Sequence, residues 1–244
     1  MAFSINRYGY LPALMGAVVI VILLFLTVSK LPNGQTVSGS SAHFYKDPQR
    51  SIAHIRLKLF YAVPRNRIDG IYQNWGDIIK LAAGDLVKFY TFQFRGLSNI
   101  KYDIYPEPFI LENESIFYDT ESTNKGNPEA LKRIVLEIEK RVPEFLAKDS
   151  GEFQVIGIIY EGVGASGTDG AFILARSFLS DEQYRPFSST LFSHEFGHTL
   201  GLPDEYKLDT NQPFTDDIMG GGRRRPIDVA HFDKPLLKDM GIIQ

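Results

Sequence analysis

HEFGHTLGLPD, residues 194–204, places two histidines, a glutamate and an aspartate within eleven residues. On a helix, residues four apart lie on the same face, so His194 and His198 can direct both imidazoles at one metal ion. Gly201 predicts the end of that helix, because glycine adopts the left-handed conformation after a last turn at no steric cost, and the proline two residues later prevents the helix from resuming. We therefore expect the chain to turn back there and to bring Asp204 to the same ion.

These residue types are typical of a catalytic zinc site, in which three protein ligands leave a fourth position open for water. The sequence predicts Zn²⁺ held by the two histidines and Asp204. The third ligand has alternatives at this point. A shift of one residue would exchange Asp204 for Glu205, and a different return of the chain would offer Asp216 or Asp217. A glutamate ligand further along is excluded, because no glutamate follows Glu205.

Glu195 is the candidate catalytic residue. Zinc lowers the pKa of its bound water to about 7 and polarises a carbonyl group, while a neighbouring carboxylate takes the water's proton and returns it to the leaving amine. The sequence thus predicts Glu195 as general base in metal-assisted hydrolysis of a peptide bond. We expect a neutral to mildly alkaline optimum, with inactivation in acid as His194 and His198 protonate and release the metal.

The pattern HExxHxxGxxH, or its variant ending in Asp, followed by a methionine turn is the signature of the metzincin clan of zinc peptidases. Residues 194–204 resemble the snapalysin-type Asp variant, and LPDEY at 202–206 is similar to that family's continuation. DDIMG at 216–220 resembles the methionine turn, which implies that Met219 forms a hydrophobic floor under the metal. The resemblance covers residues 188–221.

This resemblance implies a zinc-dependent endopeptidase that acts on protein or peptide substrates. It also implies the fold class α+β: a zincin domain with a mostly parallel twisted sheet, an antiparallel edge strand, an active-site helix and a C-terminal subdomain around the methionine turn. In this clan the antiparallel edge strand lies before the active-site helix and holds extended substrate, and residues 170–177 resemble that position. Addition of a peptide to a sheet edge supplies hydrogen bonds that are largely independent of sequence.

Hydrophobic patterns upstream predict an α/β-like N-terminal subdomain with the order strand, helix, strand, helix, strand. The five segments are 52–63, 75–89, 101–105, 127–146 and 153–160. Directly afterwards, GVGASG at 162–167 matches the glycine pattern of dinucleotide sites, but such a site needs a helix immediately after the glycines. We predict a flexible loop over 162–170 instead.

The composition and net charge exclude several kinds of partner and site. A net charge of −3 and the lack of a basic stripe predict no nucleic-acid partner. Arg223–Arg225 is the one dense basic run, and we interpret it as a solvated loop, with contact to an acidic substrate as the alternative. The chain has no cysteine, which excludes disulfides and cysteine ligands.

Residues 11–28 carry no charge and would span about 27 Å as a helix, enough to cross a bilayer. We predict a transmembrane anchor in 1–30, a flexible linker over 31–51 and a catalytic domain over 52–244 that lies outside the cytoplasm. If the anchor is instead a signal peptide, the protein is secreted.

Two other functions stay open. The first is a catalytically inactive zinc-binding module tethered to the membrane. The second is a zinc hydrolase that cleaves a different bond, because HExxH alone does not specify the substrate. Intact Glu195 argues against the first, whereas Asp204 and the methionine turn argue against the second.

Overall fold

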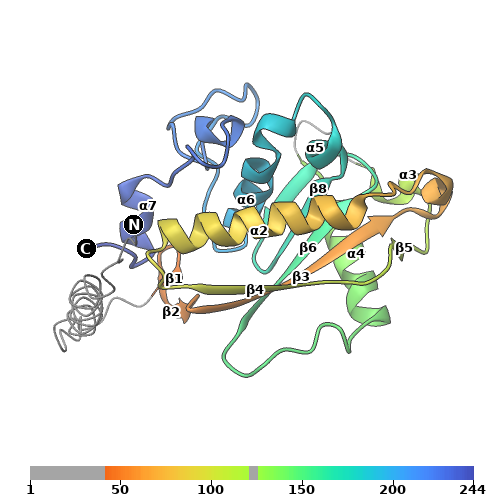
Figure 1. The fold of residues 1–244 in the computed structure, drawn as a ribbon, viewed down its shortest axis with the longest axis horizontal. Helices are drawn as coiled ribbons and strands as arrows, with labels where there is room; N and C mark the ends of the chain where they lie inside the picture. The colour runs from red at the N-terminus through yellow and green to blue at the C-terminus, as the bar shows by residue number, and fades with distance from the viewer. Residues whose placement is uncertain (1–41, 121–125) are drawn as a thin grey trace, which may run out of the picture. The chain divides into compact units, whose positions relative to one another are not determined.

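A mostly parallel six-stranded sheet forms the centre of the fold, in the order β4-β3-β6-β8-β7, with the short β5 paired to β3 (Figure 1). All its pairings are parallel except that of β7 with β8. The computed structural model describes residues 42–120 and 126–244, which belong to one unit. The strands are β3 (His54–Val63), β4 (Asn99–Ile104), β5 (Phe109–Ile110), β6 (Phe153–Tyr160), β7 (Ala165–Thr168) and β8 (Ala171–Ala175).

Helices cover both faces of this sheet. Side chains alternate along a strand, so Leu57 and Leu59 of β3 join the core under α2 (Trp75–Gln93) and α6 (Ser188–His198), whereas Phe60 joins the core under α4 (Pro128–Arg141). Figure 1 shows α2 crossing in front of the strands with α6 beside it. Burial on both faces explains why the central strands are almost continuously apolar. The structure therefore confirms the coarse class, a mixed α and β fold with a mostly parallel sheet.

The predicted upstream elements are all present, with shifted ends. The helix predicted over 127–146 opens as expected, with the Asn127 side chain accepting a hydrogen bond from the Ala130 backbone at 3.3 Å. It ends at Arg141 because Pro143 cannot continue it and also restricts the residue before it. The helix predicted over 75–89 continues to Gln93.

The prediction for the edge strand is wrong. Residues 171–175 form β8, which lies inside the sheet and pairs in parallel with β6. The antiparallel edge is β7, within the segment predicted to be a flexible loop. The two strands are joined through Asp169 and Gly170, and Gly170 has a positive φ of 75°. Asp-Gly is a strong signal for a two-residue hairpin turn, so the sequence did contain the evidence for this pairing.

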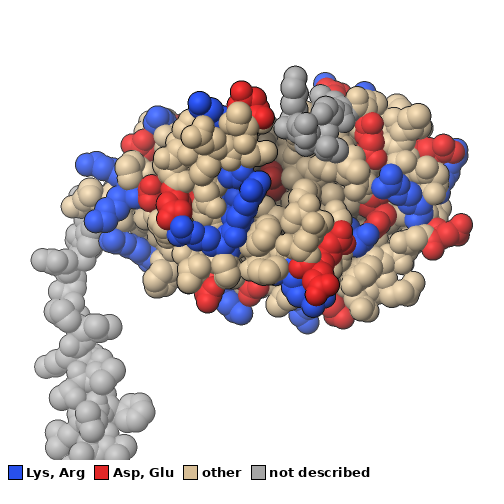
Figure 2. Space-filling model, turned by 90° about the horizontal axis from the view of Figure 1, so that it is seen from above, with Lys and Arg blue, Asp and Glu red and all other residues tan. Residues whose placement is uncertain are grey.

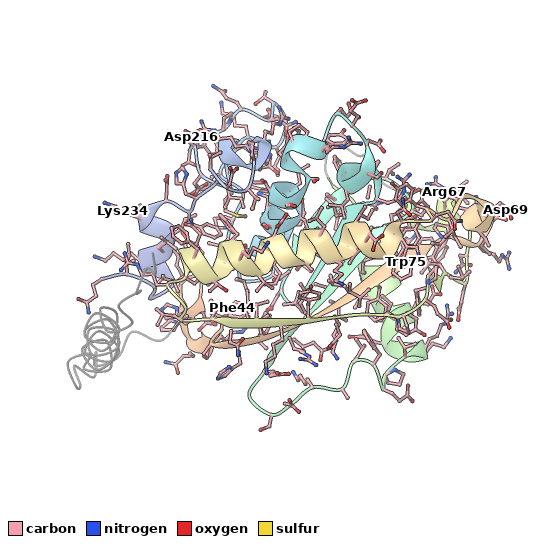
Figure 3. All side chains as sticks on the ribbon, viewed as in Figure 1. Phe44, Arg67, Asp69, Trp75, Asp216 and Lys234 are labelled. Atoms are coloured by element: carbon pink, nitrogen blue, oxygen red, sulfur yellow. The ribbon has the colours of Figure 1, made fainter. Side chains whose placement is uncertain are left out.

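The prediction of a flexible linker is wrong for residues 42–51, which form the hairpin of β1 (His43–Phe44) and β2 (Asp47–Ser51). Phe44, labelled in Figure 3, is 3% exposed and meets the Phe153 ring edge-on at 4.7 Å. The Tyr45 backbone N–H donates to the Leu200 carbonyl at 3.0 Å. The folded domain thus begins before residue 52.

The predicted anchor in 1–30 and the first part of the predicted linker, 31–41, lie outside the described residues. Within 42–120 and 126–244, no helix is both long enough and apolar enough to cross a membrane.

Beyond α6 the chain is mostly irregular and packs beside that helix. Short helical turns occur here and between the strands. They are η1 (Arg65–Gly70), α3 (Ser115–Tyr118), α5 (Ser177–Ser180), η2 (Arg185–Phe187), η3 (Gly221–Arg224) and α7 (Lys234–Asp239).

The hairpin's place in the core leads to a stability prediction. Phe44→Ala should lower the free energy of unfolding by about 3–5 kcal/mol, the usual cost of deleting a buried aromatic ring. Gln49→Ala, at an exposed position of the same hairpin, is the matched control and should change it by less than about 0.5 kcal/mol. Urea denaturation of the two variants measures both values. Equal stability of the two variants would show that the hairpin does not belong to the domain core.

Candidate metal centre

Helix α6 presents the HExxH residues from a position fixed on several sides. Phe192 packs edge-on against Phe172 of β8 at 5.1 Å, and Phe196 packs against Tyr90 of α2 at 4.8 Å. The Tyr90 hydroxyl donates to the Ser193 carbonyl at 2.9 Å. As predicted, the chain turns after this helix at Gly201, whose φ is 86°. The two histidines are therefore held on a helix that cannot easily shift.

The turn brings Asp204 to the two histidines. Its Oδ1 atom lies 3.4 Å from His194 Nε2 and 3.3 Å from His198 Nε2, and the two Nε2 atoms are 3.3 Å apart. Among the described residues, these three form the group whose ligand atoms lie close enough together to hold a metal ion. Two ligands bound at about 2.0–2.1 Å with a tetrahedral angle between them lie about 3.3 Å apart. The spacing of the three atoms thus matches one tetrahedral ion.

Backbone carbonyls fix the orientation of both imidazoles. His194 Nδ1 lies 2.9 Å from the Ile218 carbonyl oxygen, and His198 Nδ1 lies 2.8 Å from that of Leu202. A carbonyl only accepts hydrogen bonds, so we assign the proton of each neutral ring to Nδ1 and the lone pair to Nε2. Asp204 Oδ1 then has no donor, and it is indeed a buried oxygen without a hydrogen-bond partner. A cation would satisfy all three atoms at once.

The alternative third ligands are occupied elsewhere. Glu205 accepts a hydrogen bond from the Thr215 hydroxyl at 2.7 Å, and Asp216 forms an ion pair with Arg225 at 2.6 Å. Asp217 is fully buried, and its Oδ1 accepts from the Met219 backbone at 2.9 Å. It therefore shapes the turn around Met219 and does not face the histidines.

Met219 lies in the segment that follows the turn, and it packs against α6. It is fully buried, and a Cβ atom on Gly197 would come within 2.8 Å of its sulfur. The Glu205 backbone N–H donates to the Met219 carbonyl at 2.9 Å, which ties this turn to the residue beside Asp204. The methionine segment thus braces both the helix and the third ligand.

Burial and opposite charges shift the titration of the metal-free site. Burial raises the pKa of Glu195, while the charges of the two histidines lower it in part. Burial alone would lower the pKa of His198, but a hydrogen bond to Asp204 and the negative charges of Glu195 and Asp204 raise it to about 9. The pKa of Asp204 lies well below its ordinary value, because both histidines outweigh the effect of burial. Without metal, a proton on His198 supplies the missing donor to Asp204.

Two further residues lie at this site, although the sequence did not place either of them beside the metal ligands. The Tyr206 ring lies 6.1 Å from the His194 ring, and the Arg223 guanidinium stacks over Tyr206 at 3.6 Å. Arg223 is 6% exposed, so the prediction of a solvated basic loop is wrong for it, although Arg224 and Arg225 are exposed. A run of three arginines gives no signal of which member turns inward.

The edge strand β7 lies directly on the HExxH turn of α6. A Cβ atom on Gly167 would come within 2.6 Å of both the Glu195 carbonyl oxygen and His198 Cβ. Only glycine permits this approach of strand to helix. The sheet edge and the candidate metal site are therefore adjacent.

The chain matches no model of a known protein family, and no curated protein is significantly similar to it. The case for the site therefore rests on the geometry of its residues.

Metal binding should depend on Asp204 and not on its neighbour. We expect Asp204→Asn to weaken Zn²⁺ or Co²⁺ binding by roughly 100-fold or more, since loss of a group that merely supports a ligand already costs 10–100-fold. Glu205→Gln removes the same charge one residue away and should leave affinity nearly unchanged. Competition titration against a chromophoric chelator measures both, and an equal loss in the two variants would contradict the assignment.

The stability of the metal-free protein should fall with rising pH. A histidine whose pKa is raised from 6.5 to about 9 stabilises the fold fully below pH 6.5, and this contribution is lost as pH rises through 9. We expect a loss of roughly 1 kcal/mol per pH unit across that window. Urea unfolding with a chelator present tests this, and His198→Gln should abolish the slope. A wild-type stability that is flat from pH 6.5 to 9 would refute the protonated His198.

Proposed function

We propose that this chain is a zinc-dependent endopeptidase of the metzincin type. One observation carries the proposal: three ligand atoms lie at mutual distances of 3.3–3.4 Å, the spacing of tetrahedral zinc, on a helix that also bears Glu195. The resemblance of residues 188–221 to the snapalysin-type pattern supports it. So does the burial of Met219 against the same helix.

The donor set suits zinc. Two imidazole nitrogens and one carboxylate oxygen are borderline ligands that zinc accepts, and three protein ligands are the number found in catalytic sites. When bound, zinc supplies a Lewis acid that polarises a carbonyl group and makes water more acidic. His194, His198 and Asp204 would hold it.

Glu195 would move the proton. It follows His194 directly, and its side chain is buried, which makes the carboxylate a better base because burial raises its pKa. The carboxylate would accept the proton of the attacking water and deliver it to the nitrogen of the leaving amine. Both transfers require the residue to stay beside the metal ligands, as its place on α6 ensures.

A peptide substrate fits the adjacent sheet edge. β7 is the last strand in the sheet order, and Gly126 lies against its outer edge at Ala165. Further along that strand, Gly167 lies so close to α6 that a Cβ atom on it would come within 2.6 Å of the Glu195 carbonyl oxygen and of His198 Cβ. An extended peptide that pairs with the outer edge of β7 would run past the candidate metal site. This arrangement favours a polymer of amino acids over a small ester. Export to the outer side of the membrane, through an anchor in residues 1–30, stays part of the proposal.

Replacement of the general base tests the proposal. Glu195→Gln should retain zinc and lose activity on casein by about 10²–10⁴-fold, the usual contribution of a general base. Glu205→Gln is the control and should keep both zinc and activity. The measurements are metal content of the full chain and the rate of casein cleavage.

Two results would contradict the proposal. A wild-type protein that binds zinc yet cleaves neither casein nor a peptide library would point to the inactive binding module. Full activity of Glu195→Gln would remove this residue from the mechanism.

A further inference from the structure

Arg223 is a buried cation held in a fixed position. It follows the methionine turn in η3, and its guanidinium stacks over Tyr206 at 3.6 Å. One terminal nitrogen donates to the Gly220 carbonyl, and the other donates to the Asn211 side chain at 3.3 Å. These contacts orient the guanidinium, but neither partner carries a negative charge.

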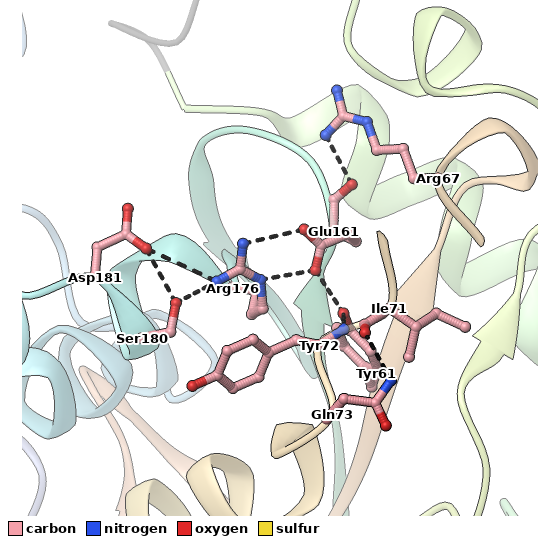
Figure 4. A network of polar contacts seen from close by, with 9 residues as sticks. All are labelled: Tyr61, Arg67, Ile71, Tyr72, Gln73, Glu161, Arg176, Ser180 and Asp181. Carbon is pink, nitrogen blue, oxygen red and sulfur yellow. Dashed lines mark hydrogen bonds and ion pairs between the residues drawn. The ribbon is translucent and has the colours of Figure 1, made fainter. Parts of the chain in front are cut away.

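Seven of the other arginines of the described chain form ion pairs with carboxylates. Arg176, for example, is held by both oxygens of Glu161 at 2.8 and 3.2 Å (Figure 4). Ion pairs to Asp or Glu also hold Arg50, Arg56, Arg67, Arg133, Arg141 and Arg225. Within the described ranges, Arg223 is the one buried arginine and forms no such pair. Buried charges normally have a partner of opposite sign. The carboxylates whose charges act on Arg223 are those of Asp204 and Glu195, the same two that a bound zinc ion would neutralise, so a further anion is needed once the metal is present.

The position of this cation links it to the candidate metal centre. Tyr206 stacks under the guanidinium on one side and lies 6.1 Å from the His194 ring on the other. Figure 2 shows a hollow near the middle of one face, with cationic side chains gathered along one side of it. Arg223 Nε has no hydrogen-bond acceptor among the described residues, and the side chain is 6% exposed. This N–H is therefore the donor left for a ligand.

We propose that Arg223 binds a carboxylate of the peptide substrate beside the scissile bond, and so determines specificity. This inference rests on the proposed peptidase function. A guanidinium presents a planar fork of N–H donors that matches a carboxylate, whereas a lysine ammonium does not. The carboxylate is either an acidic side chain or the free C-terminus of the peptide, since both offer the same two oxygens.

The test compares acidic substrates with their neutral isosteres. Peptides carry Glu or Gln at each position around the cleaved bond, and a second pair ends in a free acid or an amide. We expect the wild-type full chain to prefer one carboxylate-bearing member by about 10- to 100-fold in kcat/KM, the value of a charge-assisted contact. Preference in the Glu/Gln series identifies a side chain, and preference in the acid/amide pair identifies the C-terminus.

Two charge-matched variants assign that preference. Arg223→Gln should abolish the preference, so that each acidic peptide and its neutral isostere are cleaved at the same rate. Arg224→Gln, the exposed neighbour with the same change of charge, should retain it. Arg223→Lys keeps the charge but loses the planar pair of N–H donors, and should retain only part of the carboxylate preference. An unchanged preference in Arg223→Gln would overturn the proposal.

Binding to a non-cleaving enzyme gives a second readout. In the zinc-loaded Glu195→Gln background, calorimetry should show that the preferred acidic peptide binds about 10-fold or more tightly than its isostere, and that Arg223→Gln removes the difference. If the wild type cleaves neutral peptides but shows no carboxylate preference anywhere, the inference fails while the peptidase function stands. That result does not depend on whether an Arg223 variant folds. Absence of all cleavage would instead count against the peptidase function.

Discussion

The spacing of three atoms, His194 Nε2, His198 Nε2 and Asp204 Oδ1, is the constraint on which the rest of the site depends. While both imidazoles carry their proton on Nδ1 alone, Asp204 Oδ1 is a buried acceptor that lacks a donor, and such an atom costs free energy until a proton on His198 or a cation satisfies it. The fold nevertheless keeps the three atoms 3.3–3.4 Å apart. The carbonyls of Ile218 and Leu202 hold the imidazoles with their lone pairs inward. These three ligand atoms could therefore hold a metal ion.

The surrounding structure provides the rigidity that this arrangement needs. Tyr90 of α2 packs on Phe196 and holds the Ser193 carbonyl, while β8 contacts the same helix through Phe172. From the other side, Asp217 fixes the backbone of Met219, which lies against α6. The sheet therefore contacts the helix that carries the ligands directly, through its edge strand β7 and through β8.

The sequence revealed those parts of this site that local geometry decides. Histidines four residues apart on a helix, and a glycine that ends it, are short-range features, so Asp204 was within reach of prediction. The hairpin at 42–51 was missed because its partners lie far along the chain, for example at Leu200. The edge strand is β7 and not residues 170–177, although the Asp169-Gly170 turn already predicts the hairpin of β7 and β8. Arg223 was misjudged because its burial depends on Tyr206 and Asn211, which the sequence does not place beside it.

The formal charges of the residues at the site can be added to give its net charge with and without metal. Glu195 and Asp204 each contribute one negative charge, and Arg223 contributes one positive charge. In the metal-free protein, a proton on His198 brings this set to zero, which agrees with its raised pKa. Under the proposed function, Zn²⁺ displaces that proton and leaves a net charge of plus one in a largely buried site. Buried charge is stabilised by a counterion, and the carboxylate that we propose for Arg223 would restore neutrality. On this view the metal and the anionic substrate complement each other, because binding of the first creates the charge that the second neutralises.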